Sequence, residues 1–155
     1  MNESLPLRQL IPPVTARTAD GRIIRAWDYK QKNNLLIAFL HADCKPCGDW
    51  LARMAERTGD LSEHESVGLI VYSEPQTQSV ETLAAPFVAV TDPEGSSQRA
   101  FLGHDAFGPE GLDRVGVFVT DRYGELYGQW LAKDSSELPP PSEILKTLWQ
   151  IQVAC

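Results

Sequence analysis

Two cysteines separated by two residues lie between an apolar run and a helical pattern, and this arrangement limits the possible folds more than any other feature. The apolar run, Leu35–His41, predicts a buried central strand. The segment Cys44-Lys45-Pro46-Cys47 follows, and Cys47–Arg57 then shows helical spacing with a predicted stop at Gly59. Four residues share the inward face of this helix: Leu51, Met54, Ala55 and Thr58. The cysteine pair is therefore expected at a strand-to-helix junction.

This position favours thiol chemistry. The free backbone N–H groups at a helix N-terminus stabilise an anion, so Cys44 is placed to react as a thiolate. Lys45 adds a nearby positive charge, and Pro46 suits the first helical turn, where a missing N–H costs nothing. Cys47 lies one turn further on, close enough to attack a mixed disulfide formed at Cys44. The motif predicts two-step thiol-disulfide exchange that needs no bound cofactor.

A structural zinc site is the main alternative for the pair. Such a site needs four ligands, and the chain has no second pair of cysteines at this spacing. The further candidates are scattered along the chain: His41, His64, His104 and Cys155. The sequence therefore favours redox chemistry, with no metal ligand set predicted. A terminal thiol without a catalytic role is the favoured interpretation of Cys155.

Strands and helices alternate along the rest of the chain. Strands are predicted at Ile23–Ala26, Val67–Tyr72, Phe87–Val90, Val115–Thr120 and Glu125–Leu131. Helices are predicted at Thr77–Ala85, Ser97–Leu102 and Ser142–Val153, with Ser142 as an N-cap. The early alternation implies parallel strands with crossover helices, and the late hairpin adds antiparallel ones. We predict a single α/β domain over residues 1–155, with residues 1–20 as an irregular N-terminal extension.

Composition and charge exclude several partners. The chain has 155 residues, the length of one domain, and a formal net charge of −7. This acidity argues against nucleic acid and against an anionic membrane surface. The N-terminus shows no secretory signal, and the longest apolar stretch, Leu35–Leu40, is far shorter than the roughly 18 residues of a membrane span. We therefore expect a cytoplasmic protein with reduced thiols; its oligomeric state stays open.

Further motifs support a family resemblance. They are Asp20-Gly21-Arg22, Trp27-Asp28-Tyr29, Val88–Gly95 and Val117–Gly124. Together with the cysteine motif after its buried strand, they make the chain resemble the thioredoxin-like superfamily from about Gly21 to Ile151. More narrowly, it resembles the redoxin branch, which contains the alkyl hydroperoxide reductase/thiol-specific antioxidant (AhpC/TSA, peroxiredoxin-like) proteins. The resemblance implies a thioredoxin-like fold, in which helices flank a central mixed sheet and a redox site follows the first central strand.

Three positions depart from the thioredoxin pattern. Val115 stands where thioredoxins usually have a cis-proline, and Ala38 stands where they bury a carboxylate. Asp43 replaces the usual tryptophan before the first cysteine, and its charge opposes thiolate formation at Cys44. His41 is an alternative proton carrier near Cys44, although a surface histidine at a strand end is the favoured interpretation.

The peroxiredoxin signature is incomplete. It places a proline seven residues, and a threonine or serine three residues, before the cysteine that attacks peroxide. Counting back from Cys47 gives Leu40 and Cys44, and counting back from Cys44 gives Ile37 and His41. Neither register matches, which favours disulfide exchange over peroxide reduction.

The sequence thus predicts a thiol-disulfide oxidoreductase in cell redox homeostasis, with Cys44 attacking and Cys47 resolving. Its substrate would be a protein or small-molecule disulfide, and its electrons would come from a thiol reductant such as a thioredoxin/reductase system. One alternative is an antioxidant thiol peroxidase acting on hydroperoxides; the family's arginine then falls at Val115, next to Arg114. The other is a non-catalytic thioredoxin-like module that binds a partner or a metal through the same cysteines.

Overall fold

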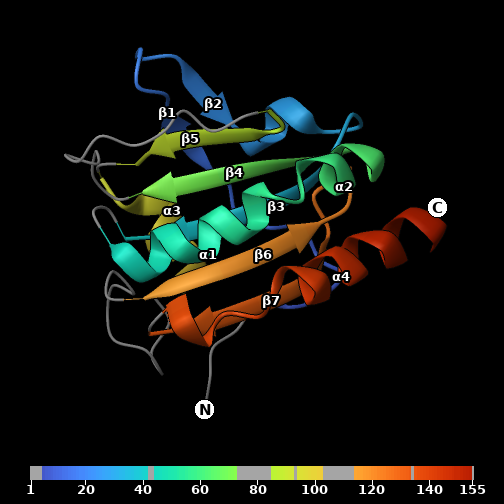
Figure 1. The fold of residues 1–155 in the computed structure, drawn as a ribbon. Helices are drawn as coiled ribbons and strands as arrows, with labels where there is room; N and C mark the ends of the chain where they lie inside the picture. The colour runs from blue at the N-terminus through green and yellow to red at the C-terminus, as the bar shows by residue number, and fades with distance from the viewer. Residues whose placement is uncertain are drawn as a thin grey trace.

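A mixed seven-stranded sheet forms the centre of the molecule (Figure 1). The computed structural model describes residues 5–41, 44–72, 85–92, 94–102, 114–133 and 135–154. The strands are β1 (Thr15–Arg17), β2 (Ile23–Arg25), β3 (Asn34–Leu40), β4 (Ser66–Tyr72), β5 (Phe87–Thr91), β6 (Val115–Thr120) and β7 (Leu126–Ala132). The α-helices are α1 (Lys45–Ala55), α2 (Thr58–Glu63), α3 (Ser96–Leu102) and α4 (Pro141–Ala154), and 3-10 turns cover η1 (Ala26–Tyr29) and η3 (Ser135–Glu137).

Strand β3 lies between β4 and β6 in the order β2-β1-β5-β4-β3-β6-β7. It pairs in parallel with β4 and antiparallel with β6, so that Ile37 is opposite both Leu69 and Phe118. Strands β4 and β5 are also parallel, whereas β6 and β7 form the predicted antiparallel hairpin. Every residue of β3 is buried, as its continuous apolar sequence predicts. The expected mixed sheet flanked by helices is confirmed.

The two faces of the sheet have separate cores. Helices α1, α2 and α4 cover one face, and α3 lies on the other (Figure 1). Successive side chains of β3 alternate between the faces. Leu36, Ala38 and Leu40 join the core under α1 and α4. Leu35, Ile37 and Phe39 join the opposite core. The first of these cores also contains Cys47, so the motif is anchored in the main packing of the fold.

Three phenylalanines hold α3 against the sheet. Phe101 of α3 packs on Phe39 of β3 and Phe118 of β6, with ring centroids 5.0 and 4.8 Å away. Phe39 and Phe118 meet edge to face at 5.9 Å. Such tilted and edge-on contacts add to the stabilisation from burial alone. The cluster lies on the face opposite α1 and stiffens the two central strands.

Two predicted boundaries near the termini are wrong. Residues 1–20 are not wholly irregular, because β1 pairs with β2 through Ala16 and Ile24 and adds both strands to the sheet beside β5. A strand of three residues is too short to show a repeating pattern. At the other end, α4 begins at Pro141, so Ser142 lies inside the first turn instead of capping it. Proline suits that first position because its N–H is not needed there.

Gly59 does not end the helical region either, because the chain resumes a helix at Thr58 and Gly59 lies within α2. The break comes at residues 56–57, between the two helices. The predicted helix Thr77–Ala85 falls almost wholly outside the described residues. Within the described ranges, no helix has the length and apolar character needed to cross a bilayer.

Gly68 and Gly59 offer a matched test of the packing. An added Cβ at Gly68 of β4 would lie 2.6 Å from the ring of Phe87, whereas at Gly59 it would meet nothing within 4 Å. Gly68→Ala is therefore expected to lower the free energy of unfolding by about 1–3 kcal/mol through overpacking. Gly59→Ala should raise it by up to about 1 kcal/mol, because alanine favours helix. Urea unfolding measures both changes, and equal effects of the two substitutions would contradict the described packing.

Candidate redox site

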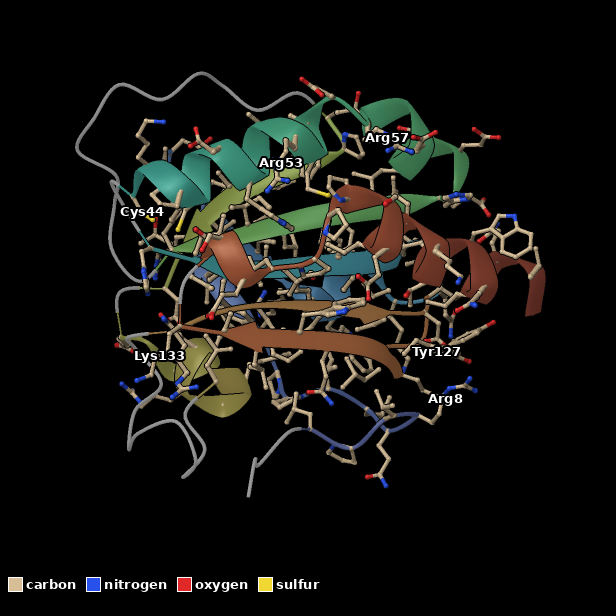
Figure 2. All side chains as sticks on the ribbon, turned by 60° about the horizontal axis from the view of Figure 1, so that its bottom comes forward. Arg8, Cys44, Arg53, Arg57, Tyr127 and Lys133 are labelled. Carbon is tan, nitrogen blue, oxygen red and sulfur yellow. The ribbon has the colours of Figure 1, made fainter. Side chains whose placement is uncertain are left out.

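The two cysteines lie where β3 gives way to α1, as predicted. Cys44 is the N-cap residue of α1, and its side chain is half-buried at the N-terminal end of the helix (Figure 2). Its Sγ accepts a hydrogen bond from the backbone N–H of Cys47 at 3.3 Å. A sulfur in this position faces the positive end of the helix dipole, where a thiolate is stabilised.

The two thiols differ in their surroundings. Cys47 is only 1% exposed and packs in the core beneath α1. Burial, followed by the hydrogen bond of its thiol to the Cys44 sulfur, raises the pKa of Cys47 to about 11. The backbone N–H of His41 and the hydroxyl of Ser135 oppose that rise in pKa. At neutral pH Cys47 is therefore a protonated thiol behind the more accessible Cys44 sulfur.

His41 lies beside both sulfurs. A nitrogen of its ring, Cys44 Sγ and Cys47 Sγ all lie within 4.8 Å of one another. The ring is half-buried, and its Nε2 atom is inaccessible to solvent without a hydrogen-bond partner in the described part of the chain. The interpretation of His41 as an ordinary surface histidine is wrong, because the end of β3 turns its ring toward the cysteine pair.

The predicted electrostatic support from Lys45 is weaker than its sequence position suggests. Its Nζ forms an ion pair with Asp49, one helical turn away, at 3.0 Å. Both side chains are largely exposed, so solvent and the carboxylate screen the lysine charge from the site. Pro46 occupies the first turn of α1 as predicted. Asp43 lies outside the described residues.

The start of β6 lies beside the site. Phe39 pairs with Gly116, and the next step of this antiparallel register brings Val115 next to Leu40, at the end of β3. Val115 is fully buried, and its peptide bond to Arg114 is trans, as expected without a proline. Arg114 is only 2% exposed, so it does not present its guanidinium at the surface.

A turn after β7 also contributes to the surroundings of Cys47, and no local sequence pattern indicates it. Ser135 of η3 is buried, and its hydroxyl lies against Cys47 without a hydrogen bond of regular geometry. Trp50 of α1 donates its indole N–H to the carbonyl of Pro139 at 3.2 Å, which ties this turn to the helix. Trp50 is thus a buried packing residue of α1. The contact joins segments far apart in the chain, where no local pattern could reveal it.

A cavity of about 260 Å³ lies at the other end of β3. Its walls include Trp27, Tyr29 and Tyr123, together with Leu35 near the start of the strand. The cysteines follow the end of the same strand, and none of the predicted site residues lines the cavity. It is therefore separate from the thiol site.

Comparison with known families identifies the chain. The model of the AhpC/TSA family matches residues 7–128, which include both cysteines. The chain belongs to the AhpC/TSA family. The match ends within β7, so α4 lies beyond it. No curated protein matches this AhpC/TSA sequence.

Solved structures confirm that this AhpC/TSA chain has a thioredoxin-like fold. The reduced 2-Cys peroxiredoxin of Plasmodium vivax matches with a TM-score of 0.73 and 13% identity, over 95% of this chain and 82% of that one. The exposed lipoprotein thioredoxin Etrx1 of Streptococcus pneumoniae matches with a TM-score of 0.64 and 18% identity, over 90% and 99%. BsSco, of the Sco family of cytochrome c oxidase assembly proteins, matches with a TM-score of 0.67 and 14% identity, over 98% of each chain. At these identities the likeness is one of fold.

The difference between the two thiols predicts the order of their alkylation. In a Cys155→Ser background, iodoacetamide at pH 8 should modify Cys44 well before Cys47, because Cys47 is buried and its pKa is raised to about 11. Modification of Cys47 should accelerate only as the pH approaches that value. Peptide mass mapping over time measures both rates, and earlier or equal labelling of Cys47 at pH 8 would contradict the described site.

Proposed function

We propose that this AhpC/TSA protein is a thiol-disulfide oxidoreductase that cycles Cys44 and Cys47 between dithiol and disulfide. The observation that carries the proposal is the hydrogen bond from the Cys47 N–H to the Cys44 sulfur at the N-terminus of α1. It gives Cys44 the surroundings of an attacking thiolate, while burial keeps Cys47 as the protonated second thiol. Membership of the redoxin family supports a redox enzyme in general.

The first step is attack on a substrate disulfide. The Cys44 thiolate forms a bond to one substrate sulfur, the substrate S–S bond breaks, and the departing thiolate takes up a proton. The helix N-terminus favours the thiolate form that makes this attack. The product is a mixed disulfide between the substrate and Cys44, at the more accessible of the two positions.

The second step uses Cys47. Its thiol loses a proton and attacks Cys44 Sγ, which forms the Cys44–Cys47 disulfide and releases the second substrate thiol. The two sulfurs start within 4.8 Å of each other, one helical turn apart. The substrate has then gained two electrons and two protons, and the chain has lost them. A partner dithiol, such as a thioredoxin/reductase system, restores the reduced pair by the reverse exchange.

A reducing compartment suits this cycle. In the cytoplasm the resting pair would be the dithiol, and the disulfide would form only transiently. The substrate in this proposal is a protein or small-molecule disulfide that reaches Cys44. Peroxide reduction is the second candidate, supported by the family and by the likeness to a peroxiredoxin fold. Two observations argue against peroxide reduction: the sequence does not match the peroxiredoxin signature, and Arg114 is buried.

Single cysteine substitutions test the assignment. In a Cys155→Ser background, Cys47→Ser should accumulate a mixed disulfide with the substrate, because the first step remains and the second is blocked. Cys44→Ser should form none and should lose disulfide reductase turnover. Non-reducing electrophoresis and mass spectrometry detect the trapped species, and an insulin reduction assay measures turnover. The Cys155→Ser protein itself is the matched control and should keep full activity.

Hydroperoxide consumption by the same variants separates the two candidate functions. Peroxide turnover that survives Cys44→Ser but not Cys47→Ser would make Cys47 the peroxide-attacking residue and overturn the proposal. Loss of disulfide reduction in the Cys155→Ser protein itself would indicate that Cys155, instead of Cys47, is the resolving thiol.

A further inference from the structure

The site contains a third donor that disulfide exchange does not use. The ring of His41 lies with Cys44 and Cys47 in a triangle whose donor atoms are all within 4.8 Å of one another. Two thiolates and an imidazole are donors that suit thiophilic metal ions such as Zn²⁺ and Cu⁺. Among the described residues, this is the only group of three or more histidine, cysteine or carboxylate donors that lie close enough together to hold a metal ion.

His41 Nε2 is a buried polar atom without a hydrogen bond in the part of the chain that the structure describes. A buried polar atom left in this state costs about 1–3 kcal/mol, so native structures usually supply a partner. The His41 backbone N–H is directed at Cys47, which holds the residue beside the pair. The ring thus has a nitrogen without a partner in the described residues, and one of its nitrogens lies within 4.8 Å of the two sulfurs.

The spacing is close to that of a metal site. Zn–S bonds of about 2.3 Å and Zn–N bonds of about 2.0–2.1 Å put neighbouring donor atoms about 3.5–3.8 Å apart. The three atoms of this site lie within 4.8 Å, so small side-chain rotations bring them to that spacing. Cys44 and His41 are only half-buried. Three protein donors would leave the fourth position of a tetrahedral ion to solvent or to another ligand.

We propose that the reduced site binds one thiophilic metal ion, of the class Zn²⁺ or Cu⁺, through Cys44, Cys47 and His41. Binding displaces the two thiol protons, and the ion keeps its oxidation state. The Cys44–Cys47 disulfide lacks both thiolate donors, so oxidation of the pair expels the metal. Metal binding and disulfide exchange are therefore mutually exclusive uses of the dithiol. This proposal rests on the proposed function because it uses the same cysteine pair. It does not require that the pair turns over a disulfide substrate.

The test is a competition titration of the reduced Cys155→Ser protein. Zn²⁺ and Cu⁺ are added in separate experiments, each against a chromophoric chelator. We expect one ion bound per chain, with affinity weakened by at least about tenfold in His41→Ala, since loss of even an indirect partner of a metal ligand has that effect. His64→Ala is the matched control and should leave affinity unchanged, because His64 caps the C-terminus of α2 beside Asn34, at the other end of β3 from the cysteines.

Two further measurements guard against a folding artefact. His41→Gln keeps a polar side chain of similar size and should also lose affinity, while both His41 variants should still form the Cys44–Cys47 disulfide. Co²⁺ added to the reduced protein should give a thiolate-to-metal charge-transfer band, which should be absent from the oxidised protein.

The outcomes distinguish this proposal from the proposed function. Failure of both Zn²⁺ and Cu⁺ to bind a protein that carries out disulfide exchange would overturn the metal site alone. Equal affinity in His41→Ala, or equal binding by the oxidised protein, would also overturn it. Metal binding that depends on His41 in a chain without disulfide exchange would support the metal site and reject the proposed function.

Discussion

The contact between the Cys44 sulfur and the N-terminus of α1 is the interaction on which the rest of the site depends. It is made by the Cys47 N–H, so the second cysteine of the motif also orients the first. The same helical turn places one sulfur near solvent and the other in the core. One local geometry therefore produces two thiols with different accessibility, and burial raises the pKa of the second one, Cys47.

Packing of the central strand keeps this contact in place. Strand β3 is buried along its whole length between two neighbours, and the cores on the two sheet faces hold it from both sides. Trp50 of α1 and the carbonyl of Pro139 then fasten the helix to the turn after β7. Buried contacts thus fix the end of β3 and the start of α1, with His41 directly after the strand and Cys44 as the N-cap of the helix. This packing places two sulfurs and an imidazole at short range.

Much of the fold follows from local patterns. The apolar run of β3, the helical spacing of α1 and the hairpin of β6 and β7 were all predicted, because each depends on a repeat or a turn within a few residues. Strand β1 was missed because three residues are too few to show alternation. Its pairing with β5 depends on a segment that is far away in the sequence. At the site, the positions of Cys44, Pro46 and Cys47 followed from their place after a strand.

By itself the sequence determined where the dithiol lies: at a strand-to-helix junction, with its first sulfur on the helix N-terminus. Only the tertiary structure decided what surrounds that dithiol. It turned His41 toward the sulfurs, engaged Lys45 with Asp49, and brought Ser135 against Cys47. The physical reason is the distance along the chain over which each interaction acts. Helix capping acts between residues three apart, whereas side-chain direction and burial depend on segments that meet only after the sheet has formed.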